Sequence, residues 1–203
     1  MTSIITGDII NSRKQDSTDW IVGLKALLNT IGATPDVWEI YRGDEFQIEI
    51  SDPSLSLHYA LLIKSYLRSI KLDARMAIGI GDKKYNGQSI SESNGSAFIH
   101  SGELFETLKR QKINLAIATA SDSLNEELNL MLQLSLSFMD SWLVQSAEFV
   151  LISLQNPTLS QEEIGRLLQI NQAAVSRRKS RTKFDLVLAL DNYFRKKIKL
   201  LNA

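Results

Sequence analysis

The sequence predicts an α+β domain over residues 1–122, followed by an all-helical domain over residues 123–203. Two patterns lead to this prediction. In the first part, short β-branched or alternating segments are interleaved with segments whose apolar residues have helical spacing. In the second part, only the helical spacing recurs. The order β-α-β-β-α-β-α-β of the first part indicates a sheet with helices packed on one of its faces.

The expected strands of the first part differ in their burial pattern. Residues 3–10 are β-branched and apolar, as in a strand buried on both faces. Residues 37–41 and 46–50 alternate between apolar and polar, and the four residues between them predict a hairpin. Further strands are expected over residues 74–80 and 113–118, and helices over residues 19–31, 53–70 and 94–109.

The second part is expected to contain four helices. Residues 130–154 form one long apolar-periodic segment, which Pro157 and its neighbours end. Two short helices and a final helix over about residues 184–200 follow. Residues 120–129 are the one linker-like stretch, so we expect the two parts to be joined there.

The composition excludes several classes of protein. The chain has 203 residues and no cysteine, which rules out a disulfide framework, cysteine metal sites and thiol catalysis. No basic segment followed by an apolar run opens the chain, and no apolar run is long enough to span a bilayer. We therefore expect a cytoplasmic protein without a membrane partner.

The charge is unevenly distributed, although the formal net charge is zero. Residues 140–203 contain ten Lys or Arg and six Asp or Glu, whereas residues 1–139 carry the compensating acidic excess. A basic C-terminal third is typical of a nucleic-acid-binding module. A solvated basic helical face would give the same charge pattern.

Residues 160–183 have the pattern of two short helices joined by a tight turn. Ser160 and Glu163 have the spacing of a capping box, so a helix should begin there. Asn171 is a good N-cap for the second helix, in which Val175 can point inward. The pattern predicts a helix-turn-helix.

The second of these helices carries side chains suited to the major groove of double-stranded DNA. Gln can pair with adenine, Arg with guanine or phosphate, and Ser with several bases. Additional basic residues would meet phosphates. The residues expected to contact DNA are Gln172, Ala173, Ser176, Arg177, Arg178, Lys179 and Arg181.

The run from Ser160 through Glu163 to Val175-Ser176-Arg177 resembles the helix-turn-helix of bacterial regulators and resolvases. Gln169 departs from that family pattern, because glycine is usual at its position in the turn. Lys179 departs as well, because an apolar residue often seats the recognition helix there. A three-helix bundle used for packing or for binding a protein partner is the alternative interpretation.

Two carboxylates of the first part are candidates for a metal site. Asp8 lies where the apolar part of the first strand ends, and Asp44 lies at the tip of the expected hairpin. If the first strand is central and beside the hairpin, the two carboxylates can hold Mg²⁺ for a nucleotide phosphate. A strand-end cap and an ordinary turn residue would give the same sequence.

The order of elements and the Gly-Asp-Glu-Phe run of the hairpin resemble the ferredoxin-like palm domain of class III nucleotide cyclases and diguanylate cyclases, over residues 3–118. The resemblance implies that Asp8 and Asp44 hold metal and that Gly43 lets the backbone approach a phosphate. Arg42, Ile99 and Glu103 stand where these families have glycine, asparagine and arginine.

Loss of the family's arginine would remove charge stabilisation at the phosphoryl centre. We therefore expect a domain that can bind a nucleotide, with Mg²⁺ as its cofactor, but does not cyclise it. Binding without turnover, an active enzyme and a purely structural acidic pair remain open.

Four segments together resemble the SatD family of bacterial proteins: GDI-x-NSR, RGDEFQ, R-x-AIGIG and the C-terminal helix-turn-helix. Two functional hypotheses follow. The first is a homodimeric transcriptional regulator whose cyclase-like domain senses a ligand. The second is a Mg²⁺-dependent nucleotide-binding or nucleotide-processing enzyme with a helical appendage.

Overall fold

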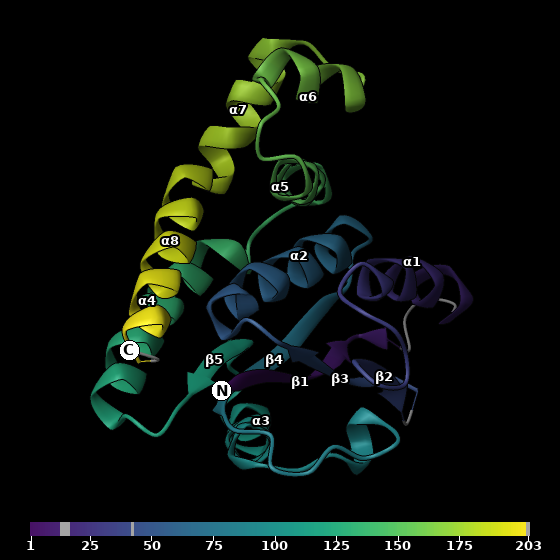
Figure 1. Cartoon of the computed structure of the whole chain (residues 1–203). Helices are drawn as coiled ribbons and strands as arrows, with labels where there is room; N and C mark the ends of the chain where they lie inside the picture. Colours follow the sequence, from purple (N-terminus) through teal and green to yellow (C-terminus); the bar gives the residue numbers. More distant parts are fainter. Residues whose placement is uncertain (13–16, 42, 202–203) are drawn as a thin grey trace.

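The computed structural model describes residues 1–12, 17–41 and 43–201, and within these ranges it contains five strands and eight α-helices (Figure 1). The strands form one mixed sheet in the order β2-β3-β1-β4-β5. Their bounds are β1 Thr2–Ile10, β2 Trp38–Tyr41, β3 Glu45–Ile50, β4 Asp73–Gly81 and β5 Leu115–Ala118. The α+β class and all five expected strands are confirmed.

The central strand β1 pairs antiparallel with both β3 and β4, while β5 is parallel to β4. The strands β2 and β3 form the expected hairpin. The helices that connect the strands are α1 (Ser17–Asn29), α2 (Ser56–Ser69), preceded by the 3-10 helix η2 (Pro53–Leu55), and α3 (Ser96–Gln111).

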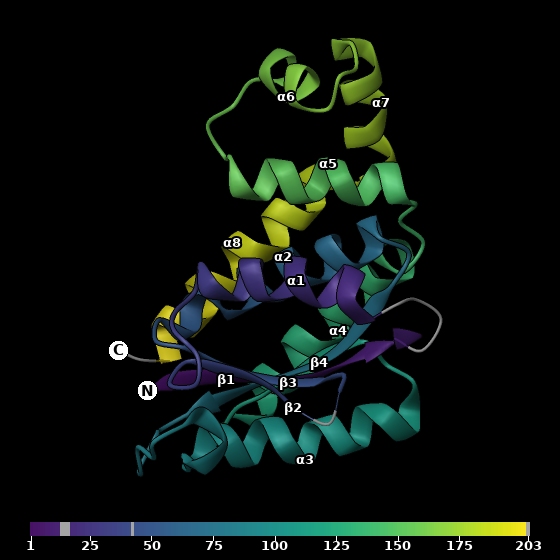
Figure 2. The same cartoon turned by 90° about the vertical axis from the view of Figure 1, so that its right-hand side faces the viewer.

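The prediction that the helices share one face of the sheet is wrong. Figure 2 shows α1 and α2 on one side of the sheet and α3 on the other. The central strands β1 and β4 are apolar and buried on both faces, so each face requires a cover. A glycine on β4 lets α3 pack closely against its face of the sheet, because a Cβ at Gly79 would lie 2.3 Å from the carbonyl oxygen of Ala97.

The helical part contains α4 (Asp122–Met139), α5 (Val144–Gln155), α6 (Gln161–Leu167), α7 (Gln172–Thr182) and α8 (Phe184–Leu201). The single long segment predicted over residues 130–154 is therefore wrong, as is the linker over residues 120–129. Ser121 caps α4 by accepting from the backbone N–H of Leu124, so the supposed linker is the first half of a helix. The helix ends at Met139 with Asp140 as its C-cap, and the Asp140 side chain contacts Lys64 of α2, with Nζ to Oδ1 at 2.6 Å.

The two parts share one hydrophobic core. Buried residues of the sheet, of α2 and of the helices α4 to α8 belong to a single continuous cluster. Lys64 is fully buried between the parts, where its ammonium also donates to Asp73 at 2.9 Å. No helix of the described residues is long and apolar enough to cross a membrane.

Candidate functional site

The helix α6 begins with the predicted capping box. The backbone N–H of Glu163 donates to Ser160 Oγ at 3.3 Å, and the backbone N–H of Ser160 donates to the Glu163 carboxylate at 2.8 Å. The second bond favours the charged carboxylate and lowers the pKa of Glu163 below its ordinary value. The start of α6 is thus fixed by residues three apart in the sequence.

The turn between α6 and α7 closes tightly against the first helix. Gln169 adopts the left-handed conformation with φ 55°, as expected where glycine is usual. The backbone N–H of Ile170 donates to the carbonyl of Gly165 at 2.9 Å. A Cβ at Gly165 would lie only 2.7 Å from the carbonyl oxygen of Ile170, so a larger residue would push the turn away.

The helix α7 is capped as predicted, because the backbone N–H of Ala174 donates to Asn171 Oδ1 at 2.9 Å. Val175 is fully buried and seats α7 against the rest of the helical part. The opposite side of the helix is open to solvent. Its exposed residues are Gln172, Ala173, Ser176, Arg177, Ser180 and Arg181.

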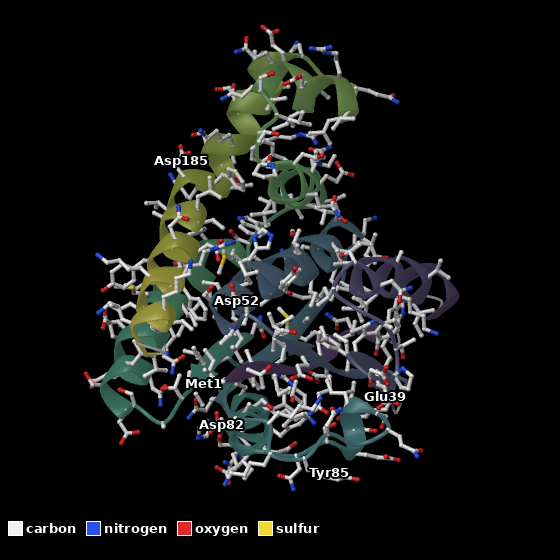
Figure 3. All side chains as sticks on the ribbon, in the orientation of Figure 1. Met1, Glu39, Asp52, Asp82, Tyr85 and Asp185 are labelled. Atoms are coloured by element: carbon white, nitrogen blue, oxygen red, sulfur yellow. The ribbon has the colours of Figure 1, made fainter. Side chains whose placement is uncertain are left out.

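Two of the predicted DNA-contacting residues lie elsewhere on α7 and have acidic partners. Arg178 Nη1 lies 3.3 Å from a carboxylate oxygen of Glu148 in α5. Lys179 Nζ lies 2.8 Å from Asp185, near the start of α8, which is labelled in Figure 3. These ion pairs hold α7 against its neighbours, and an intramolecular charge pair takes the place of the apolar seat expected at Lys179.

Asp8 and Asp44 line the same open pocket, which has a volume of about 370 Å³. The hairpin turn is attached to β1 at this point, because the backbone N–H of Ile9 donates to the carbonyl of Asp44 at 3.0 Å. Ser12 Oγ donates to Asp44 Oδ2 at 2.6 Å. The structure therefore brings the two predicted carboxylates together from positions 36 residues apart.

Asp8 lies within a row of charged residues that crosses three strands. Its partners in register are Glu45 on β3 and Arg75 on β4. Arg75 Nη1 donates to Asp8 Oδ2 at 3.1 Å, and Lys109 of α3 donates to Glu45 at 3.0 Å. Burial raises the pKa of Asp8 above its ordinary value, against the opposing effect of Arg75 and Lys109.

This charge row limits what the pocket can bind. Arg75 and Lys109 already supply cationic charge next to the carboxylates. Among the described residues, no group of three or more His, Asp or Glu side chains is placed to hold a metal ion. Within the described residues, the pocket offers a cation two carboxylates, and Asp8 is already paired with Arg75.

The cyclase-like features of the sequence lie at different distances from this pocket. Gly43 is exposed beside Asp44, with φ 91°, and a Cβ there would meet nothing within 4 Å. Ile99 and Glu103 lie on the solvent-exposed side of α3. Arg42 lies outside the described residues.

Sequence reasoning missed Arg75 and Lys109 as neighbours of the acidic pair. The signal for Arg75 was present, because it stands at the start of a predicted strand that pairs antiparallel with β1. The register that sets Arg75 opposite Asp8 could not be read from either strand alone. Lys109 carries no such signal, because its position depends on how α3 crosses the sheet.

Comparison with protein-family models, with curated proteins and with solved structures finds no match for this chain.

Proposed function

We propose that this protein is a DNA-binding transcriptional regulator. In this proposal α6 and α7 form a helix-turn-helix supported by α5, and α7 enters the major groove of double-stranded DNA. The observation that carries the proposal is the exposed face of α7, where Gln172, Ser176 and Arg177 lie in the first half of a capped helix. This is the part of a recognition helix that contacts base edges.

Some side chains of α7 suit contacts with base edges, and others suit contacts that position the helix. Gln172 and Arg177 can form paired hydrogen bonds with adenine and guanine, and Ser176 can bond with several bases. Arg181, one turn further along the same exposed side, suits a phosphate. Because Arg178 and Lys179 hold α7 in place, we assign them to positioning the helix rather than to reading the bases.

The test is binding of the full chain to double-stranded DNA from its own upstream region, measured by fluorescence anisotropy over a range of salt concentrations. We expect Arg177→Ala and Gln172→Ala each to weaken binding by about 1–3 kcal/mol, roughly 5- to 150-fold. Arg181→Ala should weaken binding to all sequences and reduce the salt dependence by about one unit of the logarithmic slope.

Lys196→Ala is the matched control, because Lys196 is exposed on α8 away from α7. It removes one positive charge and should leave the affinity within about twofold, since charges beyond a Debye length of roughly 8 Å are screened. If the wild-type chain binds no duplex at low salt, the proposal fails. The alternative of a three-helix bundle for a protein partner would then be favoured.

We further propose that residues 1–122 form a cyclase-like sensory domain that does not catalyse nucleotide cyclisation. The regulator would act as a homodimer on paired half-sites, as such modules commonly do. Sedimentation of the chain with and without a two-half-site duplex measures this directly. A single chain per duplex would contradict it.

A second candidate is a Mg²⁺-dependent nucleotide-binding or nucleotide-processing domain. The observation that favours it is the shared pocket of Asp8 and Asp44. Calorimetric titration with ATP or GTP and Mg²⁺ would test it, with Asp44→Asn as the variant and Asp36→Asn, an exposed aspartate outside the pocket, as the control. The ion pair between Asp8 and Arg75 predicts weak binding, and turnover abolished by Asp44→Asn would favour the enzyme over the sensor.

A further inference from the structure

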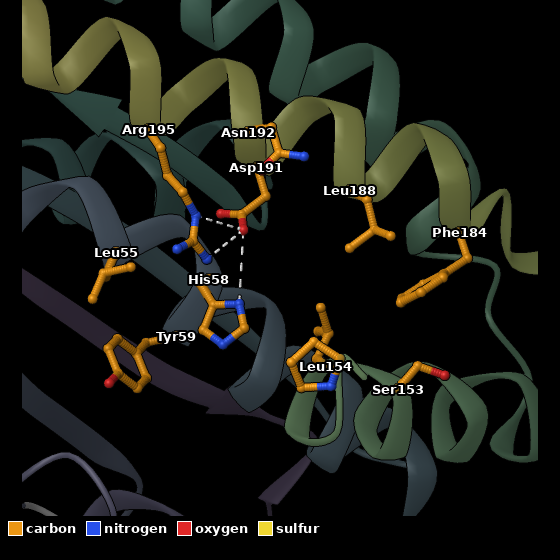
Figure 4. Close-up of a pocket in the computed structure, with 11 residues that line it drawn as sticks. Leu55, His58, Tyr59, Ser153, Leu154, Phe184, Leu188, Asp191, Asn192 and Arg195 are labelled. Carbon is orange, nitrogen blue, oxygen red and sulfur yellow. Dashed lines mark hydrogen bonds and ion pairs between the residues drawn. The ribbon is translucent and has the colours of Figure 1, made fainter. Parts of the chain in front are cut away.

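The junction between the two parts of the chain contains a second pocket, with a volume of about 450 Å³. It lies between α2, α5 and α8, as Figure 4 shows. Its wall is mixed: Leu55 and Tyr59 lie on one side and Leu154, Phe184 and Leu188 on the other, and the polar lining residues are His58, Ser153, Asp191, Asn192 and Arg195. A volume and lining of this kind are typical of sites for small organic molecules.

One end of this pocket is polar and incompletely satisfied. Asp191 of α8 is 4% exposed, and its Oδ2 accepts from Arg195 Nε at 2.9 Å and from Arg195 Nη2 at 2.6 Å. His58 Nδ1 of α2 lies 3.7 Å from the same oxygen, an ion-pair distance too long for a hydrogen bond. Asp191 Oδ1 is buried and has no hydrogen-bond partner among the described residues.

A buried carboxylate oxygen without a donor costs free energy, and native structures usually supply the missing partner. Ser153 Oγ, on the α5 side of the same pocket, is also buried without a partner in the described part of the chain. Exchange of the two oxygens by rotation of the carboxyl group still leaves one of them without a donor, because Arg195 donates to a single oxygen. A hydrogen-bond donor on a ligand would therefore complete this end.

We propose that this pocket binds a small apolar amine, with its hydrocarbon body against Leu154, Phe184 and Leu188 and its ammonium group at Asp191. The amine supplies the donor that Asp191 lacks. Its positive charge would be the second beside Asp191 after that of Arg195, so the amine is favoured by the hydrogen bond that it donates to the oxygen without a partner. An ionised carboxylic acid of the same shape offers Asp191 no hydrogen-bond donor.

A neighbouring hollow links the lining of this pocket to the α6–α7 pair. A smaller hollow of about 120 Å³ shares Ser153, Phe184 and Leu188 with it and is lined in addition by Ile164 of α6 and Lys179 of α7. Phe184 packs edge-to-face on Phe149 of α5, with ring centroids 5.3 Å apart. A ligand that presses on Phe184 therefore acts at the junction of α7 and α8, and this coupling to DNA rests on the proposed function.

The first experiment measures binding of three probes to the full chain by ¹H–¹⁵N NMR titration: 2-phenylethylamine, 3-phenylpropionate and ethylbenzene. We expect saturable binding of the amine, at least about tenfold tighter than that of the acid or of the neutral hydrocarbon, with shifts centred on α8. No saturable binding of the amine, or equal binding of the acid, would overturn the proposal.

Two variants of α8 locate the site. Leu188→Trp fills the pocket and should weaken amine binding at least about tenfold, whereas Leu186→Trp alters an exposed leucine outside it and should leave binding unchanged. Asp191→Asn should remove the preference for the amine over the hydrocarbon. Unchanged amine affinity in Leu188→Trp would overturn the site even if Asp191→Asn failed to fold.

The second experiment repeats the DNA titration with saturating 2-phenylethylamine. We expect the amine to change the affinity for DNA by about fivefold or more and DNA to change the affinity for the amine by the same factor, because the coupling is reciprocal. An amine that binds without changing DNA affinity would overturn the coupling. A chain that binds the amine but no DNA would refute the proposed regulator and the coupling, while the pocket assignment would stand.

Discussion

The α6–α7 pair and the acidic pocket of the sheet are built in opposite ways. The two caps of the pair and the close approach at Gly165 involve only residues 160–183. The acidic pocket assembles β1, the hairpin turn, β4 and, through Lys109, the helix α3. One feature is local in the sequence, and the other depends on the whole sheet.

The two features also treat charge differently. At the acidic pocket, Arg75 pairs with Asp8, and beside it Lys109 pairs with Glu45. On α7, Arg178 and Lys179 are neutralised in the same way, but Arg177 and Arg181 have no ion-pair partner among the described residues. Charge left unpaired on an exposed, rigid face is available to a partner, which is why we place the principal function on α7.

The largest expected effect tests whether both regions depend on one core. Lys64→Met removes the buried ammonium that joins Asp73 of the sheet to Asp140 of α4. Because the nearly buried carboxylate of Asp73 would lose its main partner, we expect a loss of about 3–5 kcal/mol in the free energy of unfolding. Urea unfolding followed by circular dichroism measures this loss.

Lys25→Met is the control for this change, because Lys25 is exposed on α1. It should alter the free energy of unfolding by less than about 0.5 kcal/mol. If Lys64→Met produced two separate transitions, with only the helical part destabilised, the two regions would not share one cooperative core.

The next effect distinguishes a glycine that a close approach requires from one that it does not. Gly165→Ala places a Cβ 2.7 Å from the carbonyl oxygen of Ile170 and should cost about 1–3 kcal/mol. Gly102→Ala in α3 meets nothing within 4 Å and should instead stabilise the protein by about 0.5–1 kcal/mol. Thermal unfolding of both variants measures the contrast, and equal effects would show that the turn adjusts freely.

Sequence reasoning succeeded where structure is local. Ser160, Glu163 and Asn171 are caps whose partners lie three residues away, so the pattern of residue types was enough to predict them. It failed where contacts across the fold decide. Residues 130–154 have continuous helical periodicity, yet the structure has two helices there, and Asp140 between them contacts Lys64, 76 positions earlier.

For the acidic pair, the sequence predicted the residues but not the contacts that surround them. The convergence of Asp8 and Asp44 was predicted conditionally, from a central first strand beside a hairpin, and the sheet order meets that condition. Their electrostatic surroundings could not be predicted, because the register that sets Arg75 opposite Asp8 joins positions 67 residues apart. The types of the residues were visible in the sequence, but their partners were not.

A smaller effect separates the stability of α7 from its affinity for DNA. Asn171→Ala removes the cap of α7 and should cost about 1 kcal/mol of stability. Asn171→Asp keeps a capping side chain and should preserve stability, but its negative charge would weaken DNA binding at the start of the proposed recognition helix. Thermal unfolding and anisotropy separate the two quantities, and equal DNA affinity for Asn171→Asp and wild type would place α7 outside the groove.

The smallest effect concerns the charge state of the acidic pocket. The folded chain holds the Asp8 proton more tightly than the unfolded chain does, because burial raises the pKa of this carboxyl. Asp8 therefore contributes stability that is present below its ordinary pKa and is lost as the pH rises through the raised pKa. The free energy of unfolding of the wild type, minus that of Asp8→Asn, should therefore fall as the pH rises through that range.

Carbon-13 NMR of the Asp8 carboxyl measures the pKa directly and distinguishes its causes. Arg75→Gln should raise the pKa of Asp8 further, and Asp44→Asn should lower it, since the first removes an attractive charge and the second a repulsive one. Millimolar Mg²⁺ gives the decisive comparison: a cation held by both carboxylates must lower the pKa of Asp8. A pKa of Asp8 that does not respond to Mg²⁺ would mean that Arg75, and not a metal ion, supplies the positive charge beside Asp8. The exposed face of α7 would then be the stronger functional candidate.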